Sequence, residues 1–490
     1  MLSIVVAHSY FLRFDRKQLE RAKPYPPLAT LQVASMLRQA GHTVRVFDAM
    51  LADGLAEYEQ LLLQVRPQLV LLYEDSFNFL SKMCLERMRQ AACEMIGEAR
   101  CADARVIAVG SDASDTPEPY LAAGADAVLL GEGLPALQAL VQRLDLNPHL
   151  PVAQLIDGQL GIASLTHGEL TVTRGLKPSN PQRVESPAWD LIDLERYRAV
   201  WMRAHGFFSL NMAASRGCSF RCNWCSKPIW GNRYLQRSAR EVAAEMTDLK
   251  RRFRPDHIWF ADDIFGFRVD WIAEFTQAAR AAHGAIPFTI QTRADLISVA
   301  MARALSDAGC AEVWIGAESG SQRVLSAMNK GITVEEILTA RARLKAANVR
   351  VGFFIQIGYL GEQLEDILAT RDLIDRARPD DVGVSVSYPL PGTPFYEQVK
   401  AQLGSKTHWQ ESDDLEMMFH GTYRSEFYRA VRELLHDQVS ADQPCAVQRR
   451  EHHRLAMLSL QRRWDDLIAR EALYRHDAGG TLSPAGALAV

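Results

Sequence analysis

A chain of 490 residues is too long for a single hydrophobic core and favours two or three domains. Its 48% hydrophobic and 23% charged content is typical of a soluble globular protein, and no apolar run approaches the roughly 20 residues of a membrane span. The net charge of −4 gives no basic footprint for a nucleic-acid partner. Eight cysteines are no disulfide framework in a chain of this length, and the first residues lack a secretory pattern, so we expect a reducing cytoplasm.

Residues 1–140 alternate between predicted strands and predicted helices. The strands are expected at residues 2–7, 44–48, 69–73, 105–109 and 127–130, and the helices at residues 28–39, 79–99 and 119–123. Near-continuous apolar strands joined by helices favour a parallel sheet covered on both faces. We therefore expect a doubly wound, Rossmann-like domain, which binds ligands at the carboxyl ends of its strands. Two of its strand-end loops contain Gly110-Ser111 and Gly131-Glu132, where glycine lets a ligand approach the backbone.

Two further regions flank residues 201–400. Residues 141–200 are expected to connect the domains, with a small β-hairpin at 154–162 and another at 165–173, followed by a proline-marked extended linker. Residues 401–490 are helical and aromatic, and this region could close over a substrate. Its last residues, 477–490, are small and expected to be loose.

The most informative motif is the run of three cysteines Cys218, Cys222 and Cys225, spaced C-x3-C-x2-C, with Trp224 directly before the last one. One short loop of this kind can bring three thiolates to a soft metal centre, and iron–sulfur clusters are held by such thiolates. Three ligands leave one iron of a cubane open, and an open position distinguishes a reactive metal site from a structural one. A zinc site with a distant fourth ligand, or three unrelated core cysteines, are the alternatives.

Residues 201–400 again alternate strand and helix. The expected strands are at 207–214, 257–260, 288–291, 312–315, 351–357 and 381–387, and the expected helices at 238–253, 269–283, 299–308, 334–347 and 365–377. Ser238, with Glu241 three residues on, predicts a capping box at the start of the first helix. Six strands with helices between them favour a partial (β/α)6 barrel, in which chemistry gathers at the carboxyl ends of the strands.

Chemically useful residues stand at those strand ends. They are Asp262 and Asp263 after the second strand, Arg293 after the third, Glu318 and Ser319 after the fourth, and Ile357 and Gly358 at the fifth. Carboxylates accept hydrogen bonds from an ammonium group, and an arginine can pair with a carboxylate. Each residue also has a purely structural interpretation, since Asp262 could cap a helix and Gly358 could simply form a turn.

The cysteine motif resembles the signature of the radical S-adenosylmethionine (SAM) superfamily. Four shorter markers, in the same order along the chain, resemble its cobalamin-binding branch: the runs that begin at Pro24, Ala40, Gly131 and Pro187. The Pro-Leu-Pro-Gly-Thr-Pro run after Tyr388 also resembles that branch. The resemblance implies a [4Fe-4S] cluster on the three cysteines, SAM on its open iron, and cobalamin on the N-terminal domain. It also implies an electron donor such as flavodoxin or ferredoxin.

The resemblance further implies which residues contact the cofactors. For SAM they include Trp224, which stands directly before the last cysteine. The others are Asp262 and Asp263 at the amino group, Arg293 at the carboxylate, Glu318 and Ser319 at the ribose or amino group, and Ile357 and Gly358 along the adenine. For cobalamin they are Gly110, Ser111, Gly131 and Glu132. The D-x-H-x-x-G pattern is absent, and residues 9–23 contain no histidine, so the lower face of the cobalt is expected to lack a histidine ligand. A domain that kept the fold and lost the cofactor is the alternative.

Three classes of function follow from this resemblance. The leading hypothesis is a cobalamin-dependent methyltransferase acting on an unactivated centre of a small molecule or natural-product precursor. The second is a radical oxidation or ring closure without methyl transfer, as in the anaerobic tetrapyrrole cyclase of the same branch. The third is a cobalamin or metal sensor without enzymatic activity. The first two require the strand ends of the two domains to face each other across one site.

Overall fold

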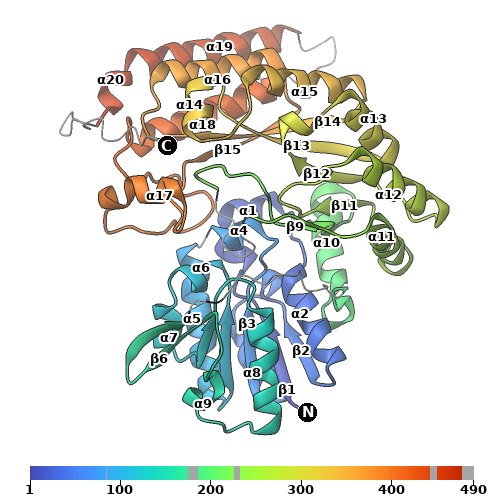
Figure 1. Cartoon of the computed structure of the whole chain (residues 1–490). Helices are drawn as coiled ribbons and strands as arrows, with labels where there is room; N and C mark the ends of the chain where they lie inside the picture. The colour runs from blue at the N-terminus through green and yellow to red at the C-terminus, as the bar shows by residue number, and fades with distance from the viewer. Residues whose placement is uncertain (84, 174, 176–185, 226–231, 442–449, 477–490) are drawn as a thin grey trace, which may run out of the picture.

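The computed structural model describes residues 1–83, 85–173, 175, 186–225, 232–441 and 450–476 (Figure 1). Two large sheets organise the chain. The N-terminal sheet has the strand order β2-β1-β3-β4-β5-β6-β7, and the second sheet has the order β15-β14-β13-β12-β11-β8. The predicted fold class, a Rossmann-like domain joined to a parallel half-barrel, is confirmed. No helix within these described ranges has the length and apolar character needed to cross a membrane.

The N-terminal sheet is parallel over its first five strands and buried on both faces. These strands are β1 (Ser3–Ala7), β2 (Thr43–Phe47), β3 (Leu69–Tyr73), β4 (Arg105–Val109) and β5 (Ala127–Leu129). Alternate residues of β1 point into two separate apolar cores: Ile4 and Val6 into one, Val5 and Ala7 into the other. The helices that share the first core are α2 (Leu28–Gln39) and α8 (Leu134–Leu146), and those that share the second are α3 (Leu55–Val65), α5 (Glu86–Cys101) and α7 (Glu118–Ala122).

The single helix predicted over residues 79–99 is two helices, α4 (Phe79–Lys82) and α5 (Glu86–Cys101). Leu85 interrupts the helix because its backbone is extended, with φ −67° and ψ 138°. Met83 and Leu85 are both buried in the core. The interruption leaves Lys82 at the edge of the N-terminal domain that faces the second sheet.

The prediction of a β-hairpin at residues 154–162 is wrong. Residues Val152–Ile156 form helix α9, which buries Leu155 completely. The second predicted hairpin is present: β6 (Ile162–Thr166) and β7 (Glu169–Thr173) pair in antiparallel fashion, and β6 pairs with β5. This hairpin extends the N-terminal sheet beyond residue 140. The predicted extended linker around Pro178 and Pro181 lies outside the described residues.

The second sheet is a half-barrel of six parallel strands. They are β8 (Ser209–Met212), β11 (His257–Phe260), β12 (Phe288–Thr292), β13 (Cys310–Glu318), β14 (Arg350–Ile357) and β15 (Asp381–Val386). The helices between them are α11 (Ala239–Phe253), α12 (Val269–Ala281), α13 (Val299–Ala308), α14 (Gln322–Ala327), α15 (Val334–Ala346) and α16 (Leu364–Ala377). Helix α11 begins with the predicted capping box, in which Ser238 and Glu241 satisfy each other's backbone N–H groups.

The C-terminal region packs against both the N-terminal domain and the half-barrel. Its helices are α17 (Pro394–Val399), α18 (Ser425–Ala441), α19 (Arg450–Ala469) and α20 (Glu471–Tyr474), and α18 packs between β15 and α19. The crossing segment, residues 404–424, lies between α17 and α18 and reaches the N-terminal domain (Figure 1). The carbonyl oxygen of Trp409 accepts a hydrogen bond from the N–H of Glu86 at 2.8 Å. The hydroxyl of Ser412 donates to Asp15 at 2.7 Å.

Residues that follow strands of both sheets meet at one junction, and Figure 1 shows β1 and β3 below the half-barrel. Lys82 follows β3, and its Nζ lies 2.7 Å from Oδ1 of Asp263, which follows β11. Glu132 follows β5 and pairs with Arg216, which precedes the cysteine motif. The remaining short elements at this junction are α1 (Arg16–Arg21), α6 (Ser111–Asp115), α10 (Leu194–His205), β9 (Ser215–Arg216) and β10 (Leu235–Gln236).

Candidate functional site

The cysteine loop begins directly after β8. Strands β9 and β10 pair in antiparallel fashion, so that the two ends of the loop lie side by side. Cys218 is buried, Cys222 and Cys225 are half-buried, and all three are thiols rather than disulfides. Asn223 fixes the middle of the loop to the end of α14: its N–H donates to the carbonyl of Met328 at 3.0 Å, and its side chain donates to the carbonyl of Ala327 at 2.6 Å. The backbone therefore holds the three thiols in one half-exposed loop.

This donor set fits an iron–sulfur cubane better than a single zinc ion. Within the part of the chain that the structure describes, no three His, Cys, Asp or Glu side chains converge on one metal ion. A structural zinc site needs four such ligands at one point. A cubane takes each thiolate on a different iron, and one loop here carries three soft donors of this kind.

Arg293, which was predicted to meet the SAM carboxylate, lies against the cysteine loop. Its Nη1 donates toward Sγ of Cys222 at 3.7 Å, and its guanidinium carbon lies 3.7 Å from the ring centre of Phe220. Its Nε and Nη2 hold the carboxylate of Asp295 at 2.9 and 3.1 Å. The guanidinium thus connects the end of β12 to one cluster cysteine.

Glu318 forms a buried ion pair at the end of β13. Nζ of Lys330 lies 2.6 Å from its Oε1, and the two side chains are only 5% and 7% exposed. The backbone of Glu318 is left-handed, with φ +58°, which turns the side chain at this point. Gly316 leaves room for the pair, because a Cβ there would lie 2.7 Å from both charged atoms. Burial lowers the pKa of Lys330, but Glu318 and Cys222 raise it overall.

Asp262 and Asp263 have different partners although they are adjacent. Asp262 accepts from the N–H of Ala214 at 3.0 Å and from the hydroxyl of Ser215, so it holds the strand that enters the cysteine loop. Burial raises the pKa of Asp262 to about 7. Asp263 pairs with Lys82 through Oδ1, while its buried Oδ2 has no hydrogen-bond partner among the described residues. Asp263 is therefore the member of the pair with an acceptor to spare.

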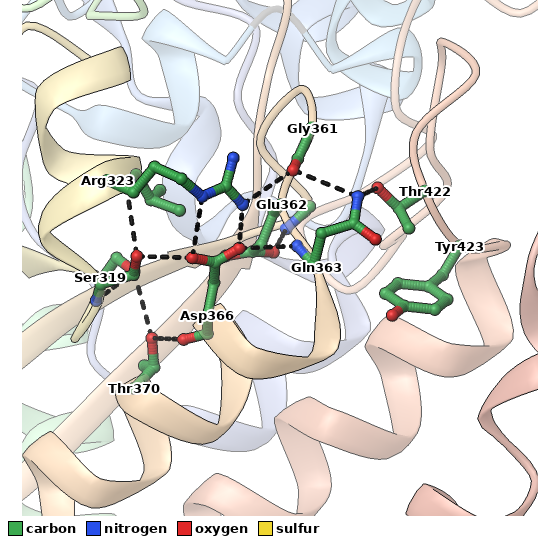
Figure 2. Close-up of polar contacts among 12 residues, drawn as sticks. Ser319, Arg323, Gly361, Glu362, Gln363, Asp366, Thr370, Thr422 and Tyr423 are labelled. Carbon is green, nitrogen blue, oxygen red and sulfur yellow. Dashed lines mark hydrogen bonds and ion pairs between the residues drawn. The ribbon is translucent and has the colours of Figure 1, made fainter.

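The other predicted SAM residues also differ in whether they have a polar atom without a partner or are already packed or paired. Trp224 has a buried Nε1 with no hydrogen-bond partner in the described chain, so this donor is available. Ile357 is buried, and Gly358 has φ +76°, a backbone conformation that favours glycine. A Cβ on Gly358 would lie 3.0 Å from Sδ of Met417, in the crossing segment. Ser319 is fully buried and faces Thr370 of α16 at 3.2 Å, in the polar network that Figure 2 shows.

Glu362 stands five residues after Ile357 and was not among the predicted site residues. Its Oε2 accepts from the N–H of Gly358 at 2.6 Å. Its Oε1 is buried and lacks a hydrogen-bond partner among the residues described. Burial raises the pKa of Glu362 to about 8, so the carboxyl is protonated at neutral pH.

The predicted cobalamin residues lie on two connected loops. Ser114 links them: its hydroxyl donates to the carbonyl of Gly110 at 2.6 Å and accepts from the N–H of Gly131 at 3.0 Å. Gly110 and Ser111 are buried, whereas Gly131 and Glu132 are half-buried. A Cβ on Gly110 would lie 2.9 Å from Cγ of Glu74, so only glycine fits this close approach. Of the four residues, Glu132 is the one that reaches the half-barrel.

Sequence analysis missed a buried acid–histidine cluster beneath these loops. His8, the residue after β1, places Nε2 3.0 Å from Asp48, and Tyr197 donates to the same carboxylate at 2.6 Å. Burial lowers the pKa of His8, but the hydrogen bond to Asp48 and the nearby acids raise it overall. Burial raises the pKa of Glu74 and of Asp75. The available signal was position: His8, Asp48, Glu74 and Asp75 directly follow the ends of β1, β2 and β3, and His8 directly precedes residues 9–23, which contain no histidine.

A groove of about 540 Å³ opens at the domain junction, beside the entry to the cysteine loop. One wall is the side of α11 from Ser238 to Arg252, and the other belongs to the N-terminal domain and the segment that follows it. Its lining includes Gln32, Phe77, Trp189, Ser215 and Arg216. A volume of this size accommodates a small-molecule ligand.

Comparison with known proteins identifies the class of this site. Residues 212–374 match the model of the Radical SAM superfamily, and this part of the chain belongs to that superfamily. The matched range contains the three cysteines, the last residue of β8, and the strands β11, β12, β13 and β14 of the half-barrel. The chain is therefore a radical SAM enzyme, and the cofactors of its half-barrel are a [4Fe-4S] cluster and SAM.

Individual relatives span most of the chain. An uncharacterized methyltransferase of Pyrococcus horikoshii is 26% identical over 381 residues, 76% of this chain and 78% of its own. The hopanoid C-3 methylase of Methylococcus capsulatus is 25% identical over 78% of this chain and 70% of its own. Among solved structures, the radical SAM methyltransferase TsrM from Kitasatospora setae, with cobalamin and a [4Fe-4S] cluster bound, has a TM-score of 0.65 at 19% identity over 82% of this chain and 75% of its own. The cobalamin-dependent SAM radical enzyme OxsB has a TM-score of 0.70 at 16% identity over 96% and 72%. These two structures share the fold of both domains.

Proposed function

We propose that the chain is a cobalamin-dependent radical SAM methyltransferase that transfers a methyl group to an unactivated centre of a small molecule. The observation that supports this proposal is that two ion pairs, Lys82–Asp263 and Glu132–Arg216, join the strand-end edge of the N-terminal sheet to that of the half-barrel. Ligands bind both kinds of domain at these edges. A cofactor on each edge would share one site. The curated relatives that act as methyltransferases support the same reaction type.

The residues at the half-barrel edge suit the two cofactors of this reaction. We assign the cluster to Cys218, Cys222 and Cys225, and the SAM amino group to Asp263, whose buried Oδ2 is unpaired within the described residues. A buried acceptor without a partner costs free energy unless a ligand satisfies it. Trp224 supplies an unpaired donor beside the last cysteine. The cluster, when bound, supplies the electron that cleaves SAM, and methylcobalamin supplies the methyl group.

The residues at the opposite edge suit cobalamin. We assign Gly131 and Glu132 to its contacts because they are half-buried and face the half-barrel, and Gly110 and Ser111 to the loop that supports them. The crossing segment closes the junction from the other side through Trp409 and Ser412. Closure matters because a carbon radical is quenched by water or oxygen, and a sealed site excludes both. The substrate would enter through the groove at α11.

The test uses SAM that carries a trideuteromethyl group, supplied to cells that express the chain beside its genomic neighbours. Methyl transfer predicts a product that retains the trideuteromethyl group and disappears in the Cys218→Ala, Cys222→Ala, Cys225→Ala variant. An unlabelled, oxidised product that still depends on the three cysteines would replace methyl transfer with radical oxidation or ring closure. A chain that cleaves no SAM under reducing, anaerobic conditions would contradict both. We propose that a flavodoxin or ferredoxin donates the electron for SAM cleavage.

A further inference from the structure

Arg293 is held in one orientation by contacts on several sides. Its side chain is 5% exposed. The carboxylate of Asp295 binds Nε and Nη2, and the carbonyl oxygen of Lys330 accepts from Nη2 at 2.9 Å. The guanidinium lies over Phe220, whose ring centre is 3.7 Å from its central carbon. A planar group fixed along one edge and one face has little freedom, so the direction of the remaining nitrogen is determined.

That remaining nitrogen, Nη1, points at a cluster cysteine. It lies 3.7 Å from Sγ of Cys222, within the range of an N–H···S hydrogen bond. Hydrogen bonds to a cluster's sulfurs and the charge around it set its reduction potential. Reduction adds negative charge to the cluster, so a cationic donor at Cys222 stabilises the reduced form. The bond is charge-assisted on both sides, which makes it stronger than a neutral one.

The second cation near Cys222 is neutralised by a buried partner. Lys330 pairs with Glu318, and both side chains are nearly inaccessible, so their charges largely cancel at a distance. The partner of Arg293 differs in two respects. Asp295 lies on the edge of the guanidinium opposite Nη1, and its side chain is 24% exposed, so water screens it more. The positive end of the Arg293–Asp295 pair is therefore the end directed at the sulfur.

We propose that Arg293 is a positioning residue for the cluster: it donates to the thiolate of Cys222, holds the loop through Phe220, and raises the reduction potential of the [4Fe-4S] cluster. This role replaces the predicted pairing with the SAM carboxylate. It rests on the radical SAM domain and not on the methyl transfer proposed above. The electron itself comes from an external one-electron reductant, and Arg293 keeps its proton throughout.

The test is a potentiometric titration of the anaerobically reconstituted full chain, without SAM, cobalamin or substrate, read by electron paramagnetic resonance of the reduced cluster. In Arg293→Gln the ratio of reduced to oxidised cluster, at the midpoint potential of the wild type, should fall about tenfold. For a one-electron couple this corresponds to a midpoint about 59 mV more negative. Iron content, measured in parallel, shows whether the cluster has assembled in the variant.

Arg323→Gln is the matched control. Figure 2 shows that Arg323 resembles Arg293 in its anchors: it holds the carboxylate of Asp366 with Nε and Nη2, and Nη2 also donates to the carbonyl of Gly361 at 2.9 Å. It differs in that, among the residues that the structure describes, it makes no hydrogen bond with a cysteine of the loop. The same substitution at Arg323 removes the same charge and should leave the midpoint potential unchanged. An equal shift in both variants would overturn the proposal, because it would show a general effect of lost charge.

Two further outcomes decide the role of Arg293. If Arg293→Gln keeps the wild-type midpoint but weakens SAM binding in equilibrium dialysis, the residue serves the SAM carboxylate and the proposal fails. If Arg293→Gln does not assemble a cluster, Arg293→Lys replaces it in the titration. An ammonium group cannot hold Asp295 in a fork and reach Cys222 at once, so a lowered midpoint is again expected. A lysine variant with the wild-type midpoint overturns the proposal.

Discussion

Replacing Lys330 with methionine should leave the carboxylate of Glu318 buried without a counter-ion. The pair is 2.6 Å long and its two side chains are 5% and 7% exposed. Removing one partner of such a pair typically destabilises a protein by about 3–5 kcal/mol, because the other charge stays out of water. A change of 1 kcal/mol lowers the Tm of a cooperative unit of about 150–250 residues by about 2–4 °C. The Tm of the half-barrel should therefore fall by about 6–20 °C.

The assay is thermal unfolding followed by circular dichroism, with the double variant Lys330→Met, Glu318→Gln beside each single one. Removing both charges leaves no uncompensated ion, so the double variant should recover most of the loss. The control is Arg350→Met. Arg350 of β14 pairs with Glu312 of β13, the strand that also carries Glu318, but Arg350 is 60% exposed, so its loss should cost only about 0–1 kcal/mol. A double variant as unstable as the sum of the two single ones would refute the reasoning.

Three other changes have expected results. Because burial raises the pKa of Asp262 to about 7, the folded state prefers the protonated form of this carboxyl group. The contribution of Asp262 to the free energy of unfolding should therefore decline as pH rises from about 4 to about 7 and change no further above it. The difference between wild type and Asp262→Asn in urea titrations isolates this decline. Gly320→Ala places a Cβ 2.1 Å from the backbone oxygen of Ala369, which cannot move aside, and should cost about 1–3 kcal/mol in the same assay, whereas unchanged stability would contradict the close approach. Arg216→Met breaks the pair with Glu132 and should raise the opening of the junction about tenfold, equivalent to about 1.4 kcal/mol, measured by hydrogen exchange at residues 131–133; unaltered exchange would show that other contacts hold the junction.

Much of the fold could be predicted because buried parallel strands leave a direct trace in the sequence. A strand covered on both faces must be apolar throughout, which is why residues 69–73 were predicted with the bounds of β3. The capping box at Ser238 was also legible, since both of its members lie within one turn. The hairpin predicted at 154–162 failed because a short alternating pattern cannot be distinguished from a helix that buries one leucine, Leu155.

The site itself could be predicted only in outline. The positions of Arg293, Asp263 and Glu318 at strand ends were correct, but the contacts of Arg293 and Asp263 come from segments far away in the chain. The pair of Asp263 with Lys82 spans 181 residues, and the contact of Arg293 with the cysteine loop spans 71. No local spacing encodes such contacts, because they depend on how whole elements pack. His8 was missed for a similar reason, since its partner Asp48 belongs to the next strand.

The crossing segment bears on how this protein is made. The hydrogen bond between Asp15 and Ser412 joins residues 397 positions apart, so the N-terminal domain leaves the ribosome long before its partner exists. At a synthesis rate of about 5–20 residues per second, the surface around Asp15 waits about 20–80 s for Ser412. During that interval the strand-end edge, where we propose that cobalamin binds, is uncovered on that side. Cofactors loaded at this stage would meet an open edge, and the last part of the chain to be made would then enclose them.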